Sequence, residues 1–260
     1  MNLNLDGKVV VVTGGTSGIG LAVINALAQE GAQPIAVARK RPETGTLPSR
    51  ARFIAADLFS AQAPEKIAAQ LEENFGRVDG FVSNAAFFSS QPSVTECSDE
   101  LWRSTFEINV FAPVRLVRAL RPLLGRNGGS IVHIASEAAR LADPTIAAYA
   151  ASKTAVLSLS KSLAIDLSAE NIRSNVVAPG PTRTALFDAP GGFGDQLAQR
   201  FQTDAESAIS RFVREERELL TGKIGHPDNV ADLVIYLLSP RANQVTGSEW
   251  SVDGGALREI

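Results

Sequence analysis

The stretch that decides the fold is Thr13-Gly14-Gly15-Thr16-Ser17-Gly18-Ile19-Gly20, which follows four consecutive valines, Val9 to Val12. A helical pattern of apolar residues comes next: Leu21, Val23, Ile24 and Leu27. This order predicts a buried parallel strand, a glycine-rich turn and the start of a helix. Glycines let the backbone turn sharply and let an anion come close, and the N-terminus of a helix attracts negative charge. The stretch therefore indicates a phosphate-binding loop, and a plain strand-to-helix turn is the alternative that this pattern alone leaves open.

Strand-like and helix-like stretches alternate along the rest of the chain. Further strands are expected at 34–38, 53–56, 80–83, 130–135, 174–178 and 249–252. Further helices are expected at 63–75, 99–124, 148–168 and 227–238, the second of them bent at Pro113. Such alternation is typical of βαβ units, so we predict an α/β fold: a Rossmann-type, doubly wound parallel sheet in a single domain over residues 1–260. A ligand is then expected beyond the carboxyl ends of the strands.

The composition argues against several classes of function. A formal net charge of −3, from 25 basic and 28 acidic residues, gives no electrostatic case for binding nucleic acid or an anionic membrane. No apolar run approaches the ~20 residues that cross a bilayer, and the N-terminus does not resemble a signal peptide, so a cytoplasmic protein is expected. Cys97 is the one cysteine, and His133 and His226 are the two histidines, so no metal site is expected.

A second stretch, Tyr149-Ala150-Ala151-Ser152-Lys153, contains a candidate acid–base pair. On a helix, the i,i+4 spacing places Tyr149 and Lys153 on one face. A nearby ammonium lowers the pKa of a phenol from its usual ~10, so that the phenol can exchange a proton near neutral pH. By itself the pair also fits an ordinary amphipathic helix. Ser136 lies thirteen residues before Tyr149 and follows the strand expected at 130–135, at the edge of the sheet where a ligand is expected.

Together these motifs resemble the short-chain dehydrogenase/reductase family, and the resemblance covers nearly the whole chain. It includes the Gly-xxx-Gly-x-Gly spacing of the first loop and the Ser136, Tyr149-xxx-Lys153 pattern. It also includes Asn109 within Glu107-Ile108-Asn109-Val110, the turn Pro179-Gly180-Pro181-Thr182-Arg183-Thr184 and the C-terminal Asp253-Gly254-Gly255.

The resemblance implies a reaction and a role for each of four residues. Nicotinamide would deliver hydride to a carbonyl carbon while Tyr149 gives a proton to the carbonyl oxygen, or the reverse reaction would oxidise an alcohol. Ser136 would hold and polarise the carbonyl. Lys153 would lower the pKa of Tyr149 and bind the nicotinamide ribose, and Asn109 would bind a water that resupplies the proton. The expected partner is therefore a small carbonyl compound or alcohol.

The resemblance also implies a set of cofactor contacts. Asp57-Leu58 stands where the family contacts adenine, and Thr182 and Thr184 stand near the expected carboxamide and pyrophosphate. Ala86 replaces the family's usual glycine, so its methyl group is expected to crowd the adenosine side. The whole set is Gly14, Thr16, Ser17, Gly18, Ile19, Gly20, Arg39, Lys40, Asp57, Leu58, Asn84, Ala85, Ala86, Tyr149, Lys153, Pro179, Gly180, Thr182 and Thr184.

The end of the strand at 34–38 bears on the choice between NAD and NADP. NAD-preferring relatives carry an acidic residue there, which binds the ribose 2′-OH and would repel a 2′-phosphate. This chain has Ala38 followed by Arg39 and Lys40, and a guanidinium suits a phosphate. We predict an NADP-dependent ketone reductase. An NAD-dependent alcohol dehydrogenase of the same family, a non-catalytic NADP(H)-binding sensor and a structural subunit with a vestigial pocket are the alternatives.

Residues 185–222 are expected to form a helical substrate lid, with glycines at 191, 192 and 194 as hinge. Two apolar sets would either contact an apolar substrate or only pack the lid onto the body: Leu197 with Phe201, and Ile209 with Phe212 and Val213. The family resemblance also implies a homo-oligomer, tetramer or dimer. Its contacts would involve helices around 101–124 and 148–167 and the C-terminal strand.

Overall fold

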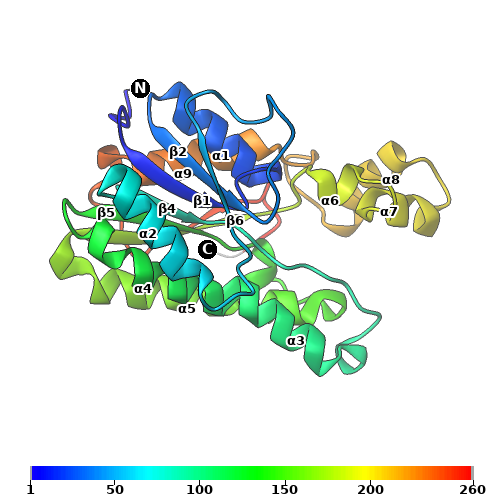
Figure 1. The fold of residues 1–260 in the computed structure, drawn as a ribbon. Coiled ribbons are helices and arrows are strands. Elements are labelled where there is room, and N and C mark those ends of the chain that lie inside the picture. The colour runs from blue at the N-terminus through cyan, green and yellow to red at the C-terminus, as the bar shows by residue number, and fades with distance from the viewer. Residues whose placement is uncertain (1, 259–260) are drawn as a thin grey trace.

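Seven parallel strands in the order β3-β2-β1-β4-β5-β6-β7 form the sheet of the computed structural model, which describes residues 2–258 (Figure 1). The strands are β1 (Val9–Thr13), β2 (Gln33–Ala38), β3 (Arg52–Ala55), β4 (Gly80–Ser83), β5 (Gly129–Ile134), β6 (Ile172–Pro179) and β7 (Glu249–Val252). The order reverses between β1 and β4, because the chain runs outward from β1 to β3 and then returns to start the other half. The predicted doubly wound sheet is confirmed, and its switch point lies at the glycine-rich loop.

Helices cover both faces of this sheet (Figure 1). One face carries α1 (Gly18–Gln29) and α9 (Pro227–Leu238), and the other carries α2 (Ala63–Phe75), α4 (Ala112–Leu124) and α5 (Ala147–Asp166). The valines of β1 explain this arrangement, since successive side chains of a strand point to opposite faces. Val10 belongs to the apolar cluster under α1 and α9, whereas Val11 belongs to the cluster under α2 and α4. Both clusters are buried, as expected for a parallel sheet.

The long helix expected at 99–124 is interrupted in the middle. It consists of α3 (Asp99–Phe106), a π-helical turn (Glu107–Phe111) and α4. Pro113 lacks an N–H group and cannot donate to the carbonyl of Asn109 four residues earlier. The N–H of Ala112 donates instead to the carbonyl of Glu107, five residues earlier. The expected bend is therefore a π-helical turn, a feature often found at functional sites, and it contains Asn109.

The segment 185–222, which we call the lid segment, forms a helical group beside the sheet (Figure 1). It contains α6 (Ala185–Asp188), α7 (Phe193–Phe201), α8 (Ala205–Arg211) and a π-helical turn (Phe212–Glu216). Its apolar residues form a cluster separate from the two under the sheet: Phe187, Leu197, Ala208, Ile209, Phe212, Val213 and Leu219, together with Ala256. The lid segment thus has its own small core.

Within residues 2–258, none of the helices combines the length and apolar character needed to span a bilayer.

Candidate active site

The glycine-rich loop between β1 and α1 depends on its glycines. Gly14 and Gly18 have positive φ angles of 65° and 51°, which L side chains rarely adopt. A Cβ atom at Gly20 would lie 2.2 Å from the carbonyl oxygen of Gly14, so only glycine fits there. The Ser17 side chain does not cap α1, and no acidic residue lies in the first turn of this helix. The loop therefore leaves backbone N–H groups for an anion, and it fits the phosphates of a dinucleotide.

Hydrogen bonds from the neighbouring strands fix the start of this loop. The Asn84 side chain donates from Nδ2 to the Thr13 carbonyl at 2.9 Å. The backbone N–H groups of Asn84 and Ala85 donate to Thr13 Oγ1 at 3.0 and 3.1 Å, and the Gly14 N–H donates to the Val37 carbonyl at 2.8 Å. The ends of β1, β2 and β4 thus hold the loop at the switch point of the sheet.

A pocket of about 670 Å³, which we call the loop pocket, lies beside the glycine-rich loop at the ends of β2, β3 and β4. Ala38 at the end of β2 brings no carboxylate to it, and the two basic residues that follow are exposed. Ten of the predicted cofactor contacts line this pocket: Gly14, Thr16, Ser17, Arg39, Lys40, Asp57, Leu58, Asn84, Ala85 and Ala86.

A second pocket, of about 440 Å³, adjoins the first, and we call it the tyrosine pocket. Both pockets are lined by Ser17, Asn84 and Ala86, so they share an edge. The predicted site residues that line the tyrosine pocket alone are Gly18, Ile19, Ser136, Tyr149, Lys153, Pro179, Gly180, Thr182 and Thr184. Of the predicted set, Gly20 and Asn109 line neither pocket. Gly20 is buried against the Gly14 carbonyl, and Asn109 is buried in the π-helical turn.

At the start of α5, Lys153 is buried and Tyr149 is half-buried. Lys153 is 3% exposed, donates from Nζ to the Ile134 carbonyl at 2.7 Å, and lies 5.5 Å from the centre of the Tyr149 ring. Burial lowers the pKa of Lys153 to about 8. The ring of Phe88 packs edge-on against Tyr149, with centroids 5.1 Å apart. These contacts hold the Tyr149 ring in the wall of the tyrosine pocket, and Tyr149 and Lys153 lie together as their i,i+4 spacing predicts.

The pKa of Tyr149 differs from the sequence-based expectation of a lowered value. Burial raises it above the usual value of a phenol, the nearby carboxylate of Glu137 raises it further, and hydrogen bonding with Ser136 acts in the opposite direction. The expectation is therefore wrong for this structure. The physical reason is that moving a phenolate out of water costs more free energy than the neighbouring groups contribute by stabilising it.

Asn109 is held by an amide-like pairing with the backbone of the loop after β4. The Phe87 N–H donates to Asn109 Oδ1 at 2.7 Å, and Asn109 Nδ2 donates to the Phe87 carbonyl at 3.1 Å. Nδ2 also donates to Ser152 Oγ at 2.9 Å, and that hydroxyl donates to the Tyr149 carbonyl at 2.7 Å. The side chain of Asn109 is thus used to connect the π-helical turn with α5.

Three charged residues that line the tyrosine pocket were not predicted from the sequence: Asp143, Glu137 and Arg217, and the last two form a pair. Glu137 follows Ser136 directly, and Ser136 Oγ donates to Glu137 Oε2 at 2.8 Å. Arg217, at the end of the lid segment's π-helical turn, forms a hydrogen-bonded ion pair with Glu137 Oε1. The position of Glu137 in the short turn that follows β5 was a usable signal. No feature of the sequence indicated that Arg217, eighty residues later, would meet it.

Apolar side chains form much of the remaining wall: Phe88, Ile146, Leu186, Phe187, Phe193 and Phe212. Among the lid residues that the sequence offered as substrate contacts, Phe212 alone lines this pocket. Leu197, Ile209 and Val213 are buried in the lid segment's own cluster. Phe201 lies beneath the guanidinium groups of Arg200 and Arg211, 4.8 and 4.6 Å from its ring centre. These four residues therefore pack the lid segment itself.

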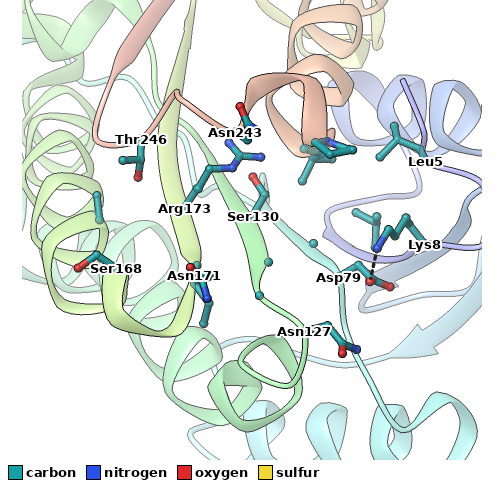
Figure 2. Close-up of a pocket in the computed structure, with 18 residues that line it drawn as sticks. Leu5, Lys8, Asp79, Asn127, Ser130, Ser168, Asn171, Arg173, Asn243 and Thr246 are labelled. Atoms are coloured by element: carbon teal, nitrogen blue, oxygen red, sulfur yellow. Dashed lines mark hydrogen bonds and ion pairs between the residues drawn. The ribbon is translucent and has the colours of Figure 1, made fainter. Parts of the chain in front are cut away.

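Figure 2 shows another hollow, of about 480 Å³, lined by residues at the amino ends of β1, β4, β5 and β6. Arg173 lies in it and donates to three backbone carbonyls of residues 237–245 at 2.7 to 3.1 Å. Lys8 pairs with Asp79 at 3.0 Å. The protein's own atoms satisfy these charges, and ligands of doubly wound sheets bind at the carboxyl ends of the strands. We therefore assign the chemistry to the loop and tyrosine pockets.

Comparison with known proteins agrees with this geometry. Residues 14–256 match the family model described as enoyl-(acyl carrier protein) reductase. The chain is 33% identical to dehydrogenase/reductase SDR family member 4 of Homo sapiens, over 96% of this chain and 88% of that protein. It is also 33% identical to the NADP-dependent (R)-specific alcohol dehydrogenase of Lentilactobacillus kefiri, over 98% of both chains. The crystal structure of L-sorbose reductase from Gluconobacter frateurii, complexed with NADPH and L-sorbose, superposes over 100% of both chains with a TM-score of 0.91 and 29% identity. The chain therefore belongs to the short-chain dehydrogenase/reductase family of oxidoreductases.

Proposed function

We propose that this protein uses NADPH to reduce a ketone to a secondary alcohol. The observation that carries the proposal is the junction of the two pockets. Ser136, Tyr149 and Lys153 line one of them, and Arg39 and Lys40 line the other. The shared edge lets one elongated dinucleotide reach from the basic residues to the tyrosine.

In this proposal the bound nicotinamide supplies the hydride, and the chain's own side chains handle the proton. Tyr149 donates its hydroxyl proton to the carbonyl oxygen as that oxygen gains negative charge. Burial keeps Tyr149 protonated, which is the state that reduction requires. Lys153 uses one N–H on the Ile134 carbonyl and retains others for a ribose hydroxyl. Ser136 lines the same pocket as Tyr149 and would orient the carbonyl by turning its hydroxyl hydrogen from Glu137 to the carbonyl oxygen.

The proposal of NADP over NAD rests on charge at the end of β2. Arg39 and Lys40 line the loop pocket, and Ala38 brings no carboxylate to the end of β2. A guanidinium binds a phosphate through two parallel hydrogen bonds, whereas a ribose hydroxyl gains less from it. The relative from Lentilactobacillus kefiri is NADP-dependent by name, and the L-sorbose reductase structure contains NADPH.

The test is kcat/KM for NADPH and for NADH, measured in the wild type and in Arg39→Ala. We expect the wild type to prefer NADPH, and Arg39→Ala to lose roughly 10-fold or more for NADPH with little change for NADH, the scale of a charge-assisted contact. Arg41→Ala is the matched control, because Arg41 lies 5.0 Å over the Phe53 ring and does not line the loop pocket. A wild type that prefers NADH would instead support an NAD-dependent alcohol dehydrogenase.

The wall of the tyrosine pocket favours a ketone with an apolar substituent. Three phenylalanines of the lid segment line it, Phe187, Phe193 and Phe212, and Phe88 faces them from the loop after β4. A polyhydroxylated substrate such as the L-sorbose named for the similar structure would leave its hydroxyls against these rings. A screen of NADPH consumption over aryl ketones, alkyl ketones and ketoses would rank these classes. Absence of turnover with all of them, combined with tight NADPH binding, would favour a sensor.

A further inference from the structure

Glu137 lines the tyrosine pocket next to Ser136, and its carboxylate has two side-chain partners among residues 2–258. Arg217 of the lid segment forms a hydrogen-bonded ion pair with Oε1, and Ser136 Oγ donates to Oε2 at 2.8 Å. The Glu137 side chain is only 8% exposed. The carboxylate oxygen Oε2 therefore depends on Ser136 for its hydrogen bond.

The hydroxyl of Ser136 can redirect its hydrogen while its oxygen stays in place. Ser136 Oγ accepts the N–H of Ala138 at 3.1 Å, which holds that atom from a second side. A serine hydroxyl has one hydrogen, and this hydrogen rotates to suit an acceptor. In the reaction proposed above, it turns from Glu137 to the carbonyl oxygen of the substrate. Glu137 Oε2 then loses its donor.

The loss of this donor leaves a buried carboxylate oxygen beside an oxygen that no longer donates to it. Arg217 holds the other carboxylate oxygen, so the Glu137 side chain cannot follow the hydrogen. A buried charged acceptor without a donor costs free energy. Because Glu137 lines the pocket, a donor carried by the substrate can offset this cost.

Such a donor has to stand close to the reacting carbonyl. Ser136 Oγ contacts both the carbonyl oxygen and Glu137 Oε2, so these two oxygens are neighbours of one atom. A hydroxyl on the carbon next to the carbonyl can reach the carboxylate while the carbonyl oxygen stays on Ser136. The other substituent of the ketone then lies against the phenylalanines of the pocket wall.

We propose that Glu137 selects ketones with a hydroxyl group on the carbon next to the carbonyl, because this hydroxyl replaces Ser136 as the donor to Glu137 Oε2. The inference rests on the proposed function and narrows its substrate to an α-hydroxy ketone with an apolar group on the other side of the carbonyl. NADPH supplies the hydride and Tyr149 the proton as before, so the product is a vicinal diol.

The tyrosine pocket has a second carboxylate, Asp143, whose contacts differ from those of Glu137. Asp143 Oδ1 accepts from the N–H and the hydroxyl of Thr145 at 2.9 and 2.6 Å. Neither donor belongs to a group that takes part in the reaction, so Asp143 keeps both when a carbonyl binds. It therefore provides a matched control for Glu137.

The probes are α-hydroxyacetophenone and α-fluoroacetophenone, and the measured quantity is the ratio of their kcat/KM values with NADPH. Fluorine is close to a hydroxyl in size and withdraws electrons, but it cannot donate a hydrogen bond. In Glu137→Gln, Arg217 retains the amide oxygen and the amide N–H groups point at Ser136, so the substrate hydroxyl loses its acceptor. We expect the ratio to fall by roughly 10-fold or more relative to the wild type, the scale of a hydrogen bond to a charged group.

The control variant is Asp143→Asn, which removes a carboxylate of the same pocket away from Ser136. We expect its ratio of kcat/KM values to stay near that of the wild type. The intrinsic reactivities of the two ketones cancel when ratios are compared between variants. An unchanged ratio in Glu137→Gln, or an equal fall in Asp143→Asn, would overturn the role assigned to Glu137.

A second measurement uses the wild type and does not require turnover. With NADP in place of NADPH neither ketone is reduced, so titration calorimetry of this complex reports binding alone. We expect α-hydroxyacetophenone to bind about 10-fold more tightly than α-fluoroacetophenone. Equal dissociation constants would contradict the inference. If no ketone is turned over with NADPH, the proposed function fails, and this comparison still decides whether the pocket selects the hydroxyl.

Discussion

Lys153 is the buried cation of the site, and its environment makes a prediction about stability. The side chain is 3% exposed, and burial lowers its pKa to about 8. In the unfolded chain the same group titrates near ~10.4. Between these two values the unfolded state binds a proton that the folded state does not, so stability rises with pH in this window. Below about pH 8 both states carry the proton, so this group adds no pH dependence there and the full cost of burying its charge is present.

Replacing Lys153 by Met removes this dependence. From pH 8 to about pH 10, we expect the free energy of unfolding of the wild type to rise relative to Lys153→Met by up to about 3 kcal/mol, since each pKa unit corresponds to about 1.4 kcal/mol. Urea denaturation at several pH values measures it. Lys161→Met is the control, because Lys161 is exposed on the same helix. If the free energy of unfolding of the wild type and of Lys153→Met changed with pH in parallel, the pKa of Lys153 would not be lowered by burial.

The chemistry-bearing residues could be predicted because local spacing determines where they lie. Tyr149 and Lys153 are one helical turn apart, so they lie on the same face of α5. Ser136 follows β5, and ligands of a doubly wound sheet bind beyond the carboxyl ends of its strands. Glu137 and Arg217 could not be paired in this way. Their contact depends on how the lid segment folds back against the turn after β5, and no local periodicity encodes a contact between residues so far apart in the sequence.

At the scale of elements, the sequence predicted the ends of a helix or strand correctly where a clear apolar pattern is bounded by turn residues. The ends of β4, β7, α2 and α9 coincide with those expected from apolar patterns and turn residues. The helix predicted at 99–124 differs from the observed structure, because Pro113 indicates a bend but does not determine which residues change their hydrogen bonding to form it. The structure assigns that change to the π-helical turn at Glu107–Phe111.

The lid segment gives the element-scale prediction. Phe193 lines the tyrosine pocket and packs edge-on against Phe187 and Phe212, with centroids 5.4 and 5.3 Å apart. We expect Phe193→Ala to raise KM for an apolar ketone by about 10-fold, the scale of lost apolar contact, while KM for NADPH changes little.

Phe201→Ala is the matched control for this experiment. Phe201 belongs to the same helix, α7, but it packs against Arg200 and Arg211 and does not line the pocket. In steady-state kinetics, we expect KM of Phe201→Ala for the apolar ketone to stay near the wild-type value. Equal increases in both variants would mean that the lid segment acts only as scaffold.

At the scale of the whole molecule, exposed apolar side chains lie on the elements where the family resemblance implies subunit contacts. Ile165 near the end of α5 is 72% exposed, Phe111 just before α4 is 49% exposed, and Trp250 on β7 is 36% exposed. Single exposed apolar residues are ordinary, but these three stand on the two helices and the strand expected to form an interface. We therefore expect a dimer or tetramer.

Light scattering at micromolar concentration tests this expectation. The wild type should have the mass of two or four chains, and Ile165→Glu should shift it toward fewer chains, because a buried unpaired carboxylate destabilises an interface. Leu220→Glu is the control, because Leu220 is similarly exposed, at 71%, but lies at the lid segment. A monomeric wild type would remove the proposal of an oligomer.

The central claim is that Tyr149 transfers the proton during carbonyl reduction with a nicotinamide cofactor, and one substitution tests it most directly. Tyr149→Phe keeps the ring that packs against Phe88 but removes the hydroxyl. Tyr236→Phe is the matched control on α9, where the ring packs against Trp250. With the best ketone from the screen, we expect Tyr149→Phe to lower kcat by roughly 10²-fold or more, with NADPH binding retained and the control near wild type. Turnover by Tyr149→Phe at the wild-type rate would contradict the account.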